Sequence, residues 1–116
     1  MTEGVVLSIT VQEIAMHSIY HLPLMVTENC IGAVDVLTDD GCVHDSYRID
    51  YLRNHIREMK KAVYDGVELI SYNVWTFMDV LSSSDGFSKR YGLVYIDRTE
   101  HDVKEMKRIR KDSFAW

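Results

Sequence analysis

The stretch Pro23-Leu24-Met25-Val26-Thr27-Glu28-Asn29 places a carboxylate and an amide directly after a short apolar run. An apolar run without alternation is typical of a strand in a parallel sheet that is buried on both faces. In a parallel (β/α)8 barrel the carboxyl ends of the strands carry the catalytic groups. The stretch therefore predicts a buried strand over residues 23–27. It also makes Glu28 a candidate catalytic carboxylate, with a solvated loop glutamate as the alternative.

The rest of the chain alternates between helical and strand patterns. Helices are predicted over about residues 5–20 and 46–64, and strands over 67–75 and 93–96. Residues 111–116 look like the start of a further helix. The clearest periodicity lies in the second helix, where apolar residues recur at Ile49, Leu52, Ile56, Met59 and Val63. This order predicts an α/β fold with a parallel strand pair joined by a right-handed crossover.

Composition limits the class of protein. With 116 residues the chain is one domain at most. A net charge of -5 argues against a general nucleic-acid or membrane-surface binder. No apolar run approaches the roughly 18 residues that a membrane-spanning helix needs. The two cysteines, Cys30 and Cys42, are predicted to be reduced thiols of a cytosolic protein.

Two further positions carry groups suited to binding a sugar phosphate. Trp75 ends the second predicted strand and offers a flat ring for stacking, although a buried core tryptophan is the alternative. Ser82, Lys89 and Tyr91 supply two hydroxyls and an ammonium, the groups that bind a phosphate monoester. Taken alone, these three common loop residues form a weak pattern, and a solvated loop is the default interpretation.

The remaining polar groups suggest no site. Cys30, Cys42, His44 and His55 do not fit the spacing of a zinc site, which usually needs a close pair of ligands. Cys42 and His44 lie two residues apart in a turn region, and no metal is expected there. The basic tail is interrupted by acidic residues and is interpreted as a solvated face. Its cations are Lys104, Lys107, Arg108, Arg110 and Lys111.

Taken together, these segments resemble glycoside hydrolase family 1, the retaining β-glycosidases, in family order. The segments that carry the resemblance are Pro23-Leu24-Met25-Val26-Thr27-Glu28-Asn29, Asp45-Ser46-Tyr47-Arg48-Ile49-Asp50-Tyr51-Leu52, Asp65-Gly66-Val67, Tyr72-Asn73-Val74-Trp75 and Ser88-Lys89-Arg90-Tyr91-Gly92-Leu93-Val94-Tyr95-Ile96-Asp97. The resemblance implies the last two βα units of a (β/α)8 barrel, incomplete as a barrel. Residues 1–116 would then be the C-terminal portion of a catalytic domain, with its last helix truncated.

The resemblance also implies a branch of the family. Ordinary β-glucosidases carry a glutamate and a tryptophan where this chain has Ser82 and Ser83. Members that act on 6-phosphosugars have serine at the first position, and the phospho-β-galactosidases keep the tryptophan at the second. The pattern implies a cytoplasmic 6-phospho-β-glucosidase that needs no metal or organic cofactor. Glu28 would be the nucleophile, Trp75 the sugar platform, and Ser82, Lys89 and Tyr91 the phosphate site.

Two departures from the family pattern bear on activity. Cys30 stands where the family has glycine, and the chain lacks the Asn-Glu-Pro motif that supplies the acid/base glutamate. We therefore expect the 116-residue polypeptide alone to be inactive, and its exposed barrel edges to favour aggregation. Two alternatives remain: a phosphosugar-binding protein without catalysis, and a piece that complements a separately encoded N-terminal part.

Overall fold

The computed structural model describes residues 15–116. These residues fall into two compact units. The first unit comprises residues 15–29 and Asp50–Asn73, and the second comprises Cys30–Ile49 and Val74–Trp116. The sheets follow the same division, since strands β1 and β2 pair with each other and β3 pairs with β4. The described residues therefore contain two separate two-stranded sheets and no closed barrel.

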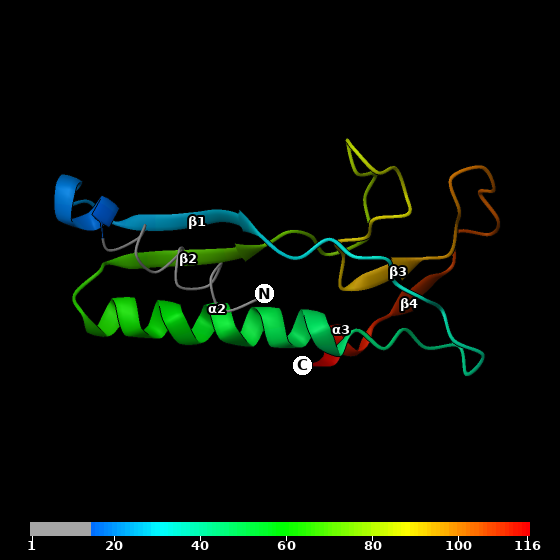
Figure 1. Cartoon of the computed structure of the whole chain (residues 1–116), viewed down its shortest axis with the longest axis horizontal. Helices are drawn as coiled ribbons and strands as arrows, with labels where there is room; N and C mark the ends of the chain where they lie inside the picture. Colours follow the sequence, from blue (N-terminus) through cyan, green and yellow to red (C-terminus); the bar gives the residue numbers. More distant parts are fainter. Residues whose placement is uncertain (1–14) are drawn as a thin grey trace. The chain divides into compact units, whose positions relative to one another are not determined.

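The first unit holds the predicted parallel strands. Strands β1 (Leu24–Asn29) and β2 (Leu69–Val74) are hydrogen-bonded neighbours, and their arrows point the same way in Figure 1. Most of the predicted helix at residues 5–20 lies outside the described residues, but residues 15–20 are helical. Strand β1 extends two residues beyond its predicted end, so that Glu28 belongs to the strand itself.

The prediction that β1 is buried on both faces is wrong. Its residues alternate between half-buried and exposed over most of the strand, and Met25 is 54% exposed. Ile70 of β2 is 66% exposed. Burial on both faces requires a layer against each side of the sheet, and the described residues supply none against the face that carries these side chains.

Helix α2 (Ser46–Tyr64) begins and ends where the sequence predicts. Its buried face, however, is turned by one residue from the predicted apolar stripe. Leu52 and Met59 are buried as expected, but Val63 is 50% exposed and His55 is 1% exposed. Polar side chains were excluded from the predicted stripe, yet His55 is accommodated because its Nδ1 lies 2.8 Å from the carbonyl oxygen of Tyr51.

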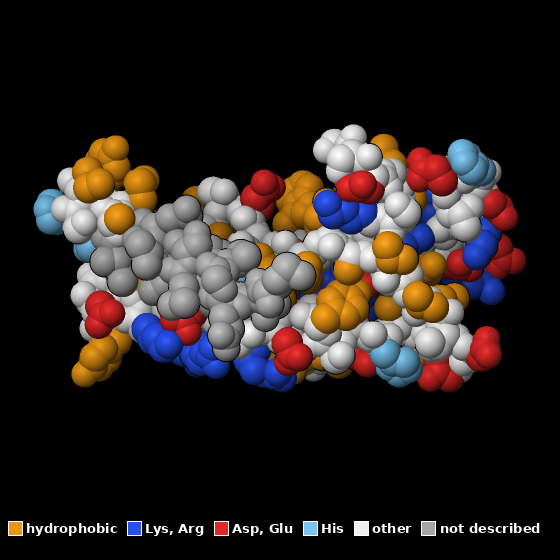
Figure 2. All heavy atoms as spheres, viewed as in Figure 1, with side chains coloured by type: hydrophobic (Ala, Val, Ile, Leu, Met, Phe, Trp, Pro, Cys, Tyr) orange, Lys and Arg blue, Asp and Glu red, His pale blue; other side chains and the backbone are white. Residues whose placement is uncertain are grey.

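The outer face of α2 is basic. Figure 2 shows Lys and Arg side chains gathered along this helix, and Arg57 and Lys61 are more than half exposed. Lys61 donates a hydrogen bond to Glu58 at 2.7 Å and Arg57 pairs with the same carboxylate, so that the pKa of Glu58 is lowered by its bond with Lys61 and, less, by Arg57. No helix within residues 15–116 is both long and apolar enough to cross a bilayer.

The second unit contains the short strands. Strand β3 (Val94–Ile96) was predicted, and all three of its residues are buried. It pairs antiparallel with β4 (Arg108–Arg110), with Tyr95 opposite Ile109. Arg108 and Arg110 are exposed on this strand, as the predicted solvated face of the tail requires. Helix α3 (Asp112–Ala115) follows, as the sequence predicts for that end of the chain.

Candidate functional site

The loop at residues 82–91 is organised around the Ser82 side chain. The Ser82 amide donates to the carbonyl of Gly86 at 3.0 Å, which closes a tight turn. The Ser82 hydroxyl accepts from the amides of Ser84 and Asp85 at 3.4 and 3.3 Å. A serine that bonds to amides two and three residues ahead stabilises a turn of this kind. Ser82 is only 7% exposed, so the alternative of a freely solvated serine does not hold.

The structure brings the three predicted phosphate-site residues together. The hydroxyl oxygens of Ser82 and Tyr91 lie 3.5 Å apart, and Lys89 Nζ lies 5.8 Å from the centroid of the Tyr91 ring. The Lys89 ammonium donates to Asp85 at 3.3 Å, and its side chain remains 37% exposed. Two hydroxyls and one accessible cation therefore lie in one loop, the arrangement that a phosphate monoester requires.

Asp85 is a member of this cluster that sequence reasoning missed. Its hydrogen bond raises the pKa of Lys89, and the Tyr91 hydroxyl adds to the shift. The pKa of Asp85 is lowered by hydrogen bonds from Ser84 and then from Lys89. The Lys89 ammonium is thus paired with Asp85, and an anionic ligand would either replace Asp85 or bind the ammonium together with it. The spacing of Asp85 four residues before Lys89 was the signal available in the sequence.

Arg90 fixes the backbone between Lys89 and Tyr91. Its amide donates to the carbonyl of Ala33 at 2.8 Å, and its own carbonyl accepts from the Ala33 amide at 3.0 Å. Its guanidinium is buried and donates to Asp79 at 3.0 Å and to the carbonyl of Ile96 at 2.8 Å. Hydrogen bonds fix both the backbone and the side chain of Arg90. The backbone positions of its neighbours Lys89 and Tyr91, two of the predicted phosphate-site residues, are therefore fixed as well.

A buried chain of alternating charges continues from Arg90. Asp79 accepts from Lys111 Nζ at 2.7 Å, and Lys111 also donates to Asp35. Asp35 lies 3.2 Å from the guanidinium of Arg48, which pairs in turn with Asp45. The cluster thus contains three carboxylates and three cations, and all six residues are buried. Its members, in order of contact, are Asp45, Arg48, Asp35, Lys111, Asp79 and Arg90.

Lys111 therefore lies in the interior, at 2% exposure, and not on the solvated face predicted for the tail. Charges are buried only when they are paired, and both carboxylates that pair with Lys111 come from distant parts of the chain. At the far end of the cluster, Asp45 accepts from the amide and hydroxyl of Ser113 at 2.8 and 2.6 Å. The cluster therefore ties helix α3 to the loop before α2.

The segment at residues 30–33 approaches the same loop closely. A Cβ placed on Gly32 would lie 2.5 Å from Tyr91 Cε1 and 2.8 Å from Lys89 Cε, so any side chain here would move both residues. The Cys30 thiol lies 3.5 Å from the carbonyl oxygen of Tyr91, and burial raises its pKa despite the nearby Arg48 guanidinium. Cys30 is therefore a neutral thiol that contacts the loop.

Glu28 lies in the first unit, near the end of β1, and is exposed. Its neighbour Asn29 accepts a hydrogen bond from the Tyr72 hydroxyl at 2.9 Å, and Asn73 donates to the carbonyl of Val26 at 3.0 Å. These bonds link β1 to β2 at the end where Glu28 stands. In the second unit Trp75 is 45% exposed, which excludes the alternative of a buried core tryptophan.

Known proteins match this chain over most of its length. The glycosyl hydrolase family 1 model matches residues 5–116. The aryl-phospho-β-D-glucosidase BglA of Bacillus subtilis (strain 168) is 52% identical over 99 residues, which is 84% of this chain and 21% of that protein. The 6-phospho-β-glucosidase AscB of Escherichia coli (strain K12) is 44% identical over 102 residues, covering 87% of this chain and 22% of that protein. The chain thus spans about a fifth of the length of the curated relatives it matches.

Solved structures agree. The family 1 β-glucosidase from Thermotoga maritima superposes with a TM-score of 0.84 at 39% identity, over 93% of this chain and 24% of that one. The match of sequence and of backbone extends through both units and includes the strand of Glu28 and the loop of Lys89. This chain belongs to glycosyl hydrolase family 1.

Proposed function

We propose that the chain carries the nucleophile and the phosphate-binding loop of a retaining 6-phospho-β-glucosidase. The observation that carries the proposal is the loop in which Ser82, Lys89 and Tyr91 meet. The loop presents hydroxyls and a cation where a negatively charged substrate group is to be bound, and it has serine at position 82 rather than a second carboxylate. Asp85 is already paired with Lys89 in this loop, and a second carboxylate at position 82 would add like-charge repulsion against a phosphate. Relatives named as phospho-β-glucosidases support the same substrate class.

Glu28 is the nucleophile in this proposal. Retaining glycosidases use one carboxylate to attack the anomeric carbon and a second carboxyl group to protonate the leaving oxygen. Glu28 stands near the carboxyl end of a parallel strand, which is where such a group is placed in a barrel made of βα units. Trp75 forms the flat surface against which the sugar ring stacks. The reaction uses carboxyl groups alone and requires no metal or organic cofactor.

The 116-residue polypeptide by itself is proposed to lack turnover. It contains no Asn-Glu-Pro tripeptide to supply the acid/base glutamate, and general acid catalysis contributes roughly 10²–10⁴-fold. In this proposal strands β1 and β2 belong to the last βα units of a barrel that other segments complete. Catalysis therefore needs those segments, and a complementing N-terminal part is one source of them. The compartment is the cytoplasm, where phosphorylated glucosides arise by phosphorylating uptake.

Complementation tests this proposal directly. The purified chain is assayed with p-nitrophenyl-β-D-glucoside 6-phosphate, alone and mixed with the N-terminal four fifths of Bacillus subtilis BglA. We expect hydrolysis only in the mixture, and its loss with Glu28→Gln. Lys89→Ala should lower kcat/KM for the phosphorylated substrate about 10–100-fold, the equivalent of one charge-assisted hydrogen bond. Equal loss on the unphosphorylated glucoside would contradict a phosphate-binding role for Lys89.

Phosphosugar binding without catalysis is the second candidate function. It is favoured by one observation: Ser82, Lys89, Tyr91 and the buried residue Arg90 that anchors them all belong to the second unit. Calorimetric titration of the chain with glucose 6-phosphate tests it. Saturable binding that Lys89→Ala removes and Glu28→Gln keeps would separate binding from catalysis.

A further inference from the structure

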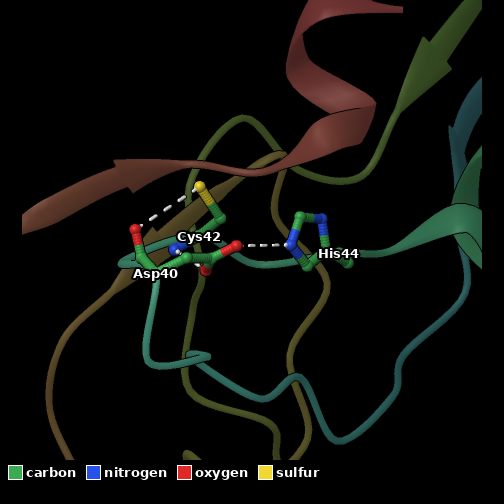
Figure 3. Close-up of side chains that lie close together, drawn as sticks. All are labelled: Asp40, Cys42 and His44. Carbon is green, nitrogen blue, oxygen red and sulfur yellow. Dashed lines mark hydrogen bonds and ion pairs between the residues drawn. The ribbon is translucent and has the colours of Figure 1, made fainter.

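Three different metal-binding groups meet in the loop that precedes α2. They are the Asp40 carboxylate, the Cys42 thiol and the His44 imidazole, and one ligand atom of each lies within 4.8 Å of the others. Figure 3 shows the Asp40 carboxylate directed at the His44 ring, with Cys42 beside it. None of the three residues has a role in the proposed glycosidase reaction.

The backbone around these residues is fixed independently of any metal. The Gly41 amide donates to the carbonyl of Thr38 at 2.9 Å, and the Thr38 amide donates to the carbonyl of Cys42 at 2.9 Å. Gly41 has a φ of 78°, which a residue with a side chain adopts only at a cost. The Cys42 amide also donates to Asp40 Oδ1 at 2.9 Å. This turn holds residues 40 and 42 on adjacent sides of one small loop.

His44 is already oriented as a metal ligand would be. Its Nδ1 lies 2.8 Å from the Asp112 carboxylate, and its Nε2 lies 3.1 Å from Asp40 Oδ2. A metal-binding histidine usually donates its other ring N–H to a carboxylate, which fixes the tautomer and makes the free nitrogen more basic. Asp112 provides this carboxylate from the first turn of α3, leaving Nε2 directed at the Asp40 side chain.

The electrostatics fit a cation at the same point. The carboxylates of Asp112 and Asp40 both lie within hydrogen-bond distance of the His44 ring, so two negative charges face the proposed cation position. The Asp40 carboxylate also accepts hydrogen bonds from the Thr38 hydroxyl and the Cys42 amide, which fix its orientation. A divalent ion would replace the proton on His44 Nε2 and the proton on the Cys42 thiol, releasing both to the solvent.

We propose that Asp40, Cys42 and His44 bind a divalent transition metal of the zinc class, with Asp112 as the residue that orients His44. Ligand atoms at about 2.0–2.3 Å from a tetrahedral metal lie roughly 3.3–3.8 Å from one another. Side-chain rotations that bring the three ligand atoms closer by about 1 Å would therefore complete the site. A thiolate with an imidazole selects zinc or cobalt over magnesium or calcium, which prefer oxygen. Three protein ligands leave a fourth position for water. The metal would tie the loop at residues 38–44 to α3 through Asp112.

Cobalt binding by the full 116-residue chain tests the proposal. The chain is freed of metal with a chelator, the chelator is removed, and Co²⁺ is titrated while absorbance is recorded. We expect one equivalent of Co²⁺ to give a sulfur-to-cobalt charge-transfer band and visible bands of a tetrahedral site, and Zn²⁺ to displace it. Cys42→Ser should abolish the charge-transfer band, whereas Cys30→Ser, which removes the other cysteine, should keep it. Asp112→Asn should weaken binding about 10–100-fold.

Other outcomes would overturn the proposal. These are a wild-type chain that gives no charge-transfer band at millimolar Co²⁺, a band that survives in Cys42→Ser, and a band that requires Cys30. His44→Asn keeps the thiol and serves as a second variant if Cys42→Ser misfolds. Binding by His44→Asn with the wild-type affinity and spectrum would also overturn the site. None of these results depends on glycosidase activity, so the proposed function and the metal site are tested separately.

Discussion

The two units organise their functional residues by different means. In the first unit, Glu28 lies on strand β1, and the apolar side chains of Met25 on β1 and Ile70 on β2 are exposed. Strand β1 is fixed by backbone pairing with β2 and by the hydrogen bond from Tyr72 to Asn29. In the second unit, two of the proposed phosphate-site residues, Lys89 and Tyr91, flank Arg90, which ends a buried chain of six alternating charges.

The difference indicates how much of each site the chain can form by itself. Buried, mutually paired charges hold one geometry because any displacement leaves a charge without its partner. The phosphate loop is therefore fixed from within its own unit. Strand β1, which carries Glu28, is paired with β2 but is largely exposed. A closed pocket around Glu28, as proposed, therefore needs further segments. Binding and catalysis should accordingly be separable by mutation.

The largest expected effect comes from removing the central cation of the buried cluster. Lys111→Met leaves three carboxylates with two cations, and breaking a buried pair in this way costs about 3–5 kcal/mol. Urea unfolding monitored by circular dichroism should show a lower midpoint or loss of the second unit. Lys107→Met removes an exposed lysine from the same tail and should change stability by less than about 0.5 kcal/mol. Equal effects of the two variants would contradict the role given to the cluster.

The close approach of Gly32 offers a second test, on binding rather than stability. Gly32→Ala places a methyl group against Tyr91 and Lys89, and we expect about tenfold weaker glucose 6-phosphate binding, the loss of roughly 1.4 kcal/mol. Gly41→Ala is the matched control, because its Cβ meets nothing within 4 Å while its positive φ lowers stability. Calorimetric titration of both variants compares them. Unchanged affinity in Gly32→Ala would show that the loop tolerates displacement.

The bond from Tyr72 to Asn29 gives the corresponding test in the first unit. Tyr72→Phe removes the neutral hydrogen bond to Asn29 and should cost about 1 kcal/mol, measured by urea unfolding. Tyr64→Phe is the control, since Tyr64 is 91% exposed. If the chain is assembled with its complementing segments, Tyr72→Phe should also lower activity, because Asn29 adjoins Glu28. A cost of several kcal/mol would mean that the first unit is more tightly organised than its exposed strands indicate.

The smallest effect is the pH dependence of the link between His44 and Asp112. Because the pKa of folded His44 lies above its usual 6.5, the pair stabilises the fold fully below about pH 6.5. That contribution is lost as the pH rises through the higher folded-state pKa. Titration of the His44 ring protons by NMR should show the raised pKa, and Asp112→Asn should lower it. Asp50→Asn, which alters an exposed pair with Arg53, should leave the titration of His44 unchanged.

Sequence patterns predicted the elements where local signals are strong. Helix α2 has the predicted bounds because its apolar spacing and its terminal residues agree, and Gly66 with its positive φ follows its end. The predicted buried face of α2 was wrong by one residue, because polar residues were excluded from it while His55 is in fact buried beside the carbonyl of Tyr51. Strand β4 was missed because three alternating residues of a charged tail carry no distinctive pattern.

The sequence by itself determined the family, the presence of a strand beside Glu28, and the loop in which Ser82, Lys89 and Tyr91 lie near one another along the chain. Only the tertiary structure decided which charges are buried. Lys111 and Asp35 are separated by 76 positions and pair in the interior, whereas Lys107 in the same tail remains exposed. In the sequence the two lysines are indistinguishable. The physical reason is that a charge can be buried only where the fold brings it an opposite charge, and that partner is set by long-range contacts.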